Sequence, residues 1–180
     1  INTAAHKEPD LITKASKKFG KSTIVVAVEA IRQPDGAYQA FTDNGRNRTG
    51  REVVSWSIEV EKLGAGEILL TSVDKEGTGE GLDKELIRKV SSVINIPLVV
   101  HGGTGQPEHV LGVEKESKIS GVSIASFLHY HFIKTNRNVD GFEAEGNIEF
   151  LKSNRLFNRI NPMALPDFKN ILSAAKVNCR

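Results

Sequence analysis

Residues 66–81 (GEILLTSVDKEGTGEG) predict a buried strand that leads into a ligand-binding loop. The apolar run at residues 68–70 is continuous rather than alternating, which is typical of a strand covered on both faces. Two acids follow, Asp74 and Glu76, and then three glycines before a helical pattern that begins at Leu82. Polar groups on a glycine-containing loop between a strand and a helix lie where α/β proteins bind ligands.

The composition is that of one globular domain. The chain has 180 residues, of which 39% are hydrophobic and 26% charged. A formal net charge of +2 and scattered lysines argue against a dedicated nucleic-acid binder, which usually carries a basic stripe. No apolar run approaches the roughly 18 residues of a membrane span, and no secretion signal is visible. The single cysteine, Cys179, excludes an internal disulfide, so we expect a cytoplasmic protein without nucleic-acid or membrane partners.

Apolar runs alternate with helical patterns along the chain. The expected strands cover residues 22–30, 68–70, 98–100 and 121–127, and the expected helices cover residues 9–19, 49–63, 82–94, 107–118 and 168–175. This alternation predicts βαβ units and a parallel sheet, as in a barrel or a doubly wound fold. Turn signals at residues 35–36 and 44–45 make residues 31–48 a hairpin-like excursion. Because the chain begins with polar residues and no initiator Met, we expect a fragment that opens at the end of a strand.

Three carboxylates fall at or just after predicted strand ends: Glu29, Asp74 and Glu76. The C-terminal ends of parallel strands share one edge of a sheet, so these carboxylates would face a common ligand. A partly desolvated carboxylate in such a place can act as a general acid or base. A helix cap, a turn residue or a surface acid is the alternative for each of them.

A second glycine-rich turn, at residues 102–105 (GGTG), precedes a predicted helix. Its backbone N–H groups could bind a phosphate, or the glycines could serve only a tight turn. His101, just before this turn, could act as a base or form a local hydrogen bond. His129 and His131 have no cysteine or paired acid at ligand spacing, so we predict no metal site.

Several motifs occur in order along the chain: INTAA at residues 1–5, PDLI at 9–12, VEKLGAGEILLTSVD at 60–74 and GGTGQPEH at 102–109. Together they resemble the cyclase subunit of imidazole glycerol phosphate synthase, the HisF family. That family folds as a (βα)8 TIM barrel of the ribulose-phosphate-binding type. The resemblance runs from Ile1 to about Tyr130. It implies a C-terminal half-barrel over residues 1–131 (the end of strand four to strand eight), a divergent insertion over 132–161 and a terminal helix over 162–180.

The resemblance implies a lyase of histidine biosynthesis. The family cyclises phosphoribulosyl-formimino aminoimidazole carboxamide ribotide with ammonia, and it releases imidazole glycerol phosphate and aminoimidazole carboxamide ribotide. A glutaminase partner subunit makes the ammonia, which passes through the barrel. The substrate carries a phosphate at each end, and no cofactor is implied.

The resemblance also assigns roles to individual residues. Glu29 stands where the family has a catalytic aspartate at the end of strand five, and Glu67 matches a charged residue of the ammonia gate. The remaining matches would bind the substrate: Asn2 and Thr3 at one phosphate, and Gly102, Gly103, Ala125 and Ser126 at the other. Glu76 and Gly77 also match substrate-binding positions. They belong to the rim motif Asp-x-Glu-Gly-Thr, in which the family has an aspartate in place of Glu76.

Four positions depart from the family pattern. Glu29 and Glu76 replace aspartates, and His101 and Thr104 stand for a serine and an alanine. The family's other catalytic aspartate lies on the first strand, which this chain does not include. We therefore keep two alternatives: a paralogous barrel that uses ammonia in surface-sugar modification, and a non-catalytic phosphate-binding half-barrel. The run GAGEILLTS favours the cyclase over a related phosphosugar isomerase, and we expect the 180-residue chain alone to be inactive.

Overall fold

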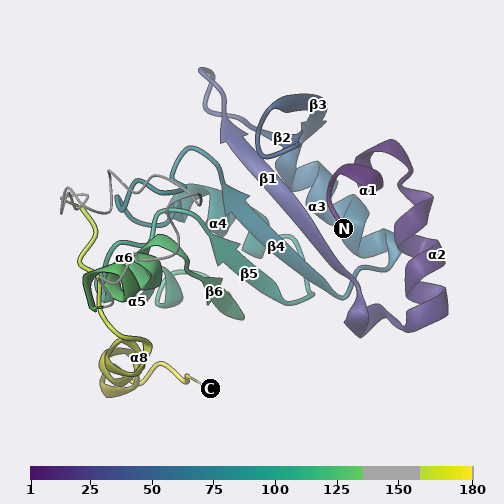
Figure 1. Ribbon diagram of the computed structural model, residues 1–180. Coiled ribbons are helices and arrows are strands. Elements are labelled where there is room, and N and C mark those ends of the chain that lie inside the picture. The colour runs from purple at the N-terminus through teal and green to yellow at the C-terminus, as the bar shows by residue number, and fades with distance from the viewer. Residues whose placement is uncertain (136–158, 180) are drawn as a thin grey trace, which may run out of the picture.

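The computed structural model describes residues 1–135 and 159–179 as an α/β fold built on one six-stranded sheet (Figure 1). The strand order is β3-β2-β1-β4-β5-β6. The parallel strands are β1 (Val25–Arg32), β4 (Glu67–Ser72), β5 (Leu98–His101) and β6 (Gly121–Ser123). Two antiparallel strands, β2 (Tyr38–Thr42) and β3 (Asn47–Glu52), extend the sheet beyond β1. The predicted parallel sheet is confirmed, and its connectivity fits part of a (βα)8 barrel.

Helices connect the parallel strands, and α3 and α4 lie behind the sheet in the view of Figure 1. The helices are α1 (Thr3–Lys7), α2 (Asp10–Phe19), the 3-10 helix η1 (Lys21–Thr23), α3 (Val53–Leu63), α4 (Lys84–Ser91), α5 (Pro107–Glu114), α6 (Ser126–Thr135) and α8 (Leu165–Ala174). Within the described part of the chain, no helix is both long and apolar enough to cross a membrane. Most of the insertion predicted at 132–161 lies outside the described residues.

Residues 49–52 form the end of β3, so the prediction that they open a helix was wrong. They belong to a polar run that pairs with Gln39 and Phe41 of β2. The helix α3 begins only at Val53, where the side chain of Glu52 accepts hydrogen bonds from two backbone N–H groups of the first turn. Glu52 therefore ends one element and caps the next.

The last parallel strand is shorter than the predicted strand at residues 121–127. β6 ends at Ser123, and α6 begins at Ser126. Phe127 is fully buried against Phe168 of α8, with ring centroids 5.2 Å apart. The apolar residues at the end of the run therefore pack as part of a helix, which a short apolar run alone cannot distinguish from a strand.

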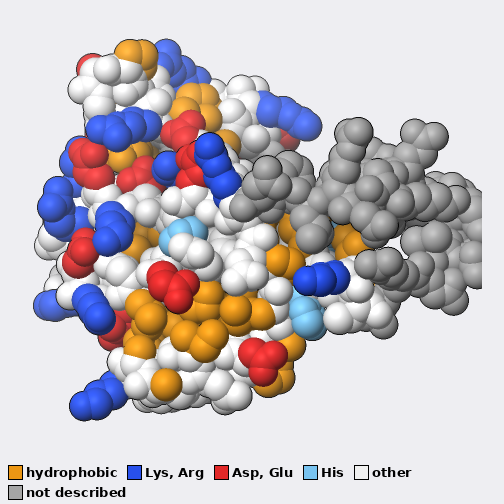
Figure 2. Space-filling view, turned by 90° about the vertical axis from the view of Figure 1, so that its left-hand side faces the viewer, with side chains coloured by type: hydrophobic (Ala, Val, Ile, Leu, Met, Phe, Trp, Pro, Cys, Tyr) orange, Lys and Arg blue, Asp and Glu red, His pale blue; other side chains and the backbone are white. Residues whose placement is uncertain are grey.

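The two faces of the sheet differ in burial. Val26, Val28 and Leu70 are at most 1% exposed and belong to the main core. The opposite face carries Leu69 in lateral register with Ala27 and Val99, and these side chains stay partly exposed in the described chain. Figure 2 shows that hydrophobic side chains also gather in a surface patch bordered by charged ones.

We expect the 180-residue chain, produced alone, to self-associate, because a partly exposed apolar sheet face and free strand edges attract other copies. Sedimentation velocity over a concentration series should show species larger than the monomer. Leu69→Lys places a charge in the middle of that face and should shift the distribution toward the monomer. Phe19→Lys, at a 62% exposed position on α2, is the matched control and should leave the distribution unchanged. A monomer at every concentration would contradict the expectation.

Candidate active site

Four side chains form one lateral row at the C-terminal ends of the parallel strands. Glu29 of β1 pairs with Thr71 of β4, which in turn pairs with His101 of β5. Ser123 of β6 completes the row beside His101. Laterally paired residues point to the same face of a sheet, and neighbouring strands lie about 4.8 Å apart, so Glu29 and His101 face the same space from backbones roughly 10 Å apart.

Glu29 is held by a hydrogen bond at each carboxylate oxygen. Its Oε1 accepts from Nδ2 of Asn2 at 2.7 Å, and its Oε2 accepts from the backbone N–H of Gly45 at 2.8 Å. Gly45 lies in the turn between β2 and β3, where Asp43, Asn44 and Gly45 all have positive φ. These two hydrogen bonds fix the position of the carboxylate, which keeps free lone pairs and can accept a proton.

Asn2 and Thr3, predicted as phosphate ligands, lie at the Glu29 end of the row. The amide nitrogen of Asn2 is used on Glu29, while its Oδ1 is buried without a partner among the described residues. Thr3 is the first residue of α1. The phosphate assignment of this pair stays a prediction.

Two acids on or just after β4, Asp74 and Glu67, lie apart from the row. Asp74 accepts a hydrogen bond from the backbone N–H of Arg32 at 2.7 Å, so it ties the loop after β4 to the end of β1. Glu67 is the first residue of β4, beside Val25. It shares a sheet face with Thr71 but stands four residues earlier, about 13 Å away along the strand. Glu67 is thus at the opposite end of the open face, and its assignment to an ammonia gate stays a prediction.

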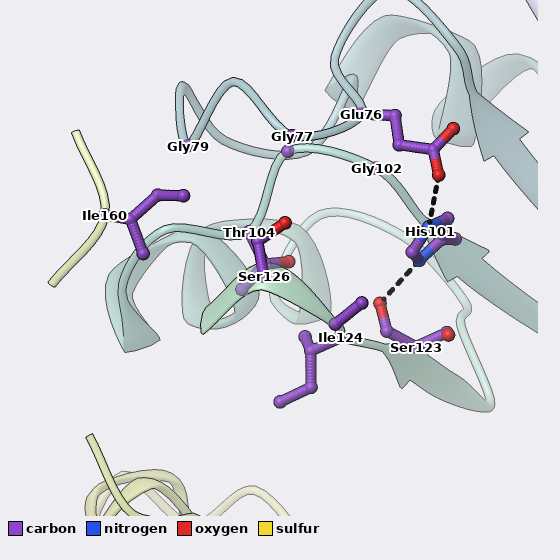
Figure 3. Close-up of a pocket in the computed structure, with 12 residues that line it drawn as sticks. Glu76, Gly77, Gly79, His101, Gly102, Thr104, Ser123, Ile124, Ser126 and Ile160 are labelled. Carbon is purple, nitrogen blue, oxygen red and sulfur yellow. Dashed lines mark hydrogen bonds and ion pairs between the residues drawn. The ribbon is translucent and has the colours of Figure 1, made fainter. Parts of the chain in front are cut away.

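A cavity of about 240 Å³ adjoins the row at the β5–β6 end (Figure 3). It brings together six of the predicted substrate-binding residues. The lining consists of Glu76, Gly77, Gly79, His101, Gly102, Gly103, Thr104, Ser123, Ile124, Ala125, Ser126 and Ile160. The α6 helix begins at this cavity, and the first N–H groups of a helix have no partner within it, which favours an anion there.

His101 connects the row to the cavity. Its Nδ1 lies 3.0 Å from the carbonyl oxygen of Ser123, and its Nε2 lies 3.4 Å from Oε1 of Glu76 (Figure 3). His109, on the neighbouring helix α5, is different: its Nδ1 accepts the backbone N–H of Gly105 at 3.1 Å, and burial lowers the pKa of the imidazole. His109 therefore acts as a neutral structural histidine, whereas His101 faces the cavity.

Thr71, Ser123 and Ile160 are parts of the site that the sequence did not reveal. Thr71 could have been found from the sequence, because it lies an even number of residues after Glu67 on the same strand and so points to the same face. Ser123 contributes its backbone carbonyl, and Ile160 comes from beyond α6 along the chain, so neither leaves a recognisable pattern.

Comparison with known proteins shows the family of this chain. The family model described as "Histidine biosynthesis protein" matches residues 1–134. A relative from Dehalococcoides mccartyi, named imidazole glycerol phosphate synthase subunit HisF, is 44% identical over 130 residues, which cover 72% of this chain and 51% of the relative. A protein of the same name from Legionella pneumophila is 50% identical over 108 residues, which cover 60% of this chain and 51% of that protein. The chain spans about half the length of these relatives. Because the family model covers most of its residues, the chain belongs to the histidine biosynthesis protein family.

Proposed function

We propose that this chain forms the part of a cyclase active site that binds one substrate phosphate and accepts a proton during ring closure. The parent enzyme would be the cyclase subunit of imidazole glycerol phosphate synthase, a cytoplasmic lyase that uses ammonia. The observation that carries the proposal is the shared row: Glu29 and the cavity at His101 open onto one edge of the parallel sheet. Relatives named HisF support it.

The geometry suits a substrate with a phosphate at each end. One phosphate would occupy the cavity between the glycine turn and the start of α6, and the other would lie near Asn2 and Thr3. The reacting centre would then sit between them, beside Glu29. Two anchored ends hold that centre in position, which is worth several orders of magnitude in rate. The Glu29 carboxylate would take a proton as nitrogen adds and the ring closes.

A glutaminase partner would supply ammonia at the Glu67 end of the open face. Between Glu67 and the row lie Leu69 and its apolar lateral neighbours Ala27 and Val99. An apolar path lets neutral ammonia pass and excludes ammonium, because an unpaired charge is costly to desolvate. Glu67 would act as a gate or docking residue.

The test is turnover by the intact protein with the ribotide and an ammonium salt, which bypasses the partner. We expect imidazole glycerol phosphate to form. Glu67→Gln should lower the glutamine-driven rate with the partner at least tenfold and change the ammonium-driven rate less than twofold. Glu61→Gln is the matched control, since Glu61 bonds the backbone N–H of Asn95 outside the site. Equal losses in both assays would contradict the gate.

The second candidate is a paralogous barrel that takes a different phosphorylated substrate. The contact between Glu76 and His101 favours it, because the cyclase family has shorter side chains at both positions. The absence of product from the ribotide at any pH, together with intact binding of phosphate esters, would favour this paralogue or a non-catalytic binding protein.

A further inference from the structure

His101 presents a fixed hydrogen-bond donor to Ser123. A carbonyl oxygen only accepts, so the contact of Nδ1 with the oxygen of Ser123 at 3.0 Å requires the hydrogen to be on Nδ1. This bond orients the ring and leaves Nε2 facing the cavity. The ring is well covered, with only 19% of its side-chain surface exposed.

The partner of Nε2 is also an acceptor. Oε1 of Glu76 lies 3.4 Å from Nε2, and an ionised carboxylate has lone pairs only. With Nδ1 already bearing hydrogen, a neutral ring would turn a lone pair toward that carboxylate. The arrangement therefore suits an imidazolium with acceptors at both nitrogens. Glu76 is the movable member of the pair, because 55% of its side chain is exposed.

Thr104 provides an independent sign that a polar ligand belongs in the cavity. It lines the cavity, is 8% exposed, and its Oγ1 is buried without a hydrogen-bond partner among the described residues. A buried hydroxyl without a partner is costly, so it is expected to bond to a ligand or to water. Both this threonine and His101 replace smaller residues of the cyclase family, so they are features of this chain.

We propose that protonated His101 is an anion ligand in this cavity, that Thr104 donates a second hydrogen bond, and that Glu76 is the counter-ion that the anion displaces. In the empty cavity the imidazolium pairs with Glu76. A phosphoryl group takes that place, and the carboxylate turns to solvent with its charge intact. The proposal rests on the phosphate-binding part of the proposed function, but it needs no cyclase chemistry.

The exchange makes anion binding dependent on pH. Among the described residues that line the cavity, Glu76 and His101 are the only ones with an acidic or basic side chain. The strand neighbours Thr71 and Ser123 carry no charge, and Glu29 is two strands away. The nearby cations Lys75 and Arg159 both pair with Glu80 and keep their charge across this pH range. Because the proposed ligand is the imidazolium, affinity should fall as pH rises, with a limit of tenfold per pH unit for one linked proton.

Sulfate is the probe of choice, because it stays a dianion between pH 6 and about pH 8. Calorimetric titration of the intact protein in two buffers of different ionisation enthalpy gives affinity and proton uptake together. We expect weaker binding at the higher pH, with up to one proton taken up per sulfate. His101→Ser should bind weakly and without pH dependence. His129→Ser, at an exposed position of α6, is the matched control and should behave like the unaltered protein.

Two further variants test the other partners. Thr104→Ala should weaken sulfate binding about fivefold, the value of one ordinary hydrogen bond, and Thr104→Ser should not. Glu76→Gln removes the competing charge, so it should bind sulfate at least as tightly as the unaltered protein at the lower pH. Far-ultraviolet circular dichroism confirms that each variant is folded.

Three results would overturn the proposal: no sulfate binding by the unaltered protein, the same pH dependence in His101→Ser, or loss of binding in Glu76→Gln. Turnover of the ribotide is measured separately. Turnover without proton-linked sulfate binding would reject the proposal for His101 and leave the cyclase. Proton-linked binding without turnover would reject the cyclase and leave His101 as an anion ligand.

Discussion

Glu29→Gln should lower the turnover number of the intact enzyme with ammonium by about 10²- to 10⁴-fold, the usual contribution of a general base. The amide cannot accept the proton that the carboxylate takes. It also places an NH2 group against one of the two donors, Asn2 Nδ2 or Gly45 N–H, since both oxygens of Glu29 are acceptors. The Michaelis constant should change much less, because the phosphate cavity beside His101 does not include Glu29.

Glu29→Asp distinguishes a working cyclase active site from one that has lost or changed its activity. Aspartate is one methylene shorter, and partners at 2.7 and 2.8 Å leave no slack for both contacts to survive. If glutamate is the working base, the rate should fall about tenfold or more, since proton transfer tolerates roughly half an ångström. A large gain in rate would instead show that the site is impaired by glutamate. Glu59→Gln, on the surface of α3, is the control and should stay within twofold.

The fold was largely predictable from the sequence because its parallel strands are apolar runs. The apolar run at residues 68–70 predicts β4, and the run at residues 98–100 predicts β5. The strand β3 gave no such signal, since its residues 47–52 (NRTGRE) are polar and are mostly exposed or half-exposed at the sheet edge. Only its pairing with β2 makes it a strand, and pairing is a tertiary property.

The candidate site was predictable in its positions but not in its contacts. Strand ends and glycine turns placed Glu29 and Glu76 at one edge, and the structure agrees. The partners of Glu29 could not be foreseen, because Asn2 is 27 residues away and Gly45 sits in a turn whose register depends on β2 and β3. The orientation of His101 likewise depends on a backbone carbonyl of the adjacent strand.

Gly103→Ala should lower the free energy of unfolding by about 2–4 kcal/mol, whereas Gly77→Ala should lower it by about 1 kcal/mol. Both glycines have left-handed backbones, with φ of 102° and 74°, so each alanine carries a strain of roughly 1 kcal/mol. They differ in their surroundings. A Cβ at Gly103 would lie 2.2 Å from the carbonyl oxygen of Gly81, while a Cβ at Gly77 would have open space within 4 Å.

The contact at Gly103 cannot relax easily, because the N–H of Gly81 donates to the carbonyl of Gly103 at 2.7 Å and holds the two loops together. Overpacking of this kind usually costs a further 1–3 kcal/mol. Urea unfolding with an unchanged m-value would measure the difference between the two variants. Equal losses would mean that the loops separate freely. A Gly77→Ala variant that is stable but no longer binds sulfate would show that Gly77 is needed for ligand binding. Gly103, in contrast, is needed for the close backbone packing of the two loops beside the cavity.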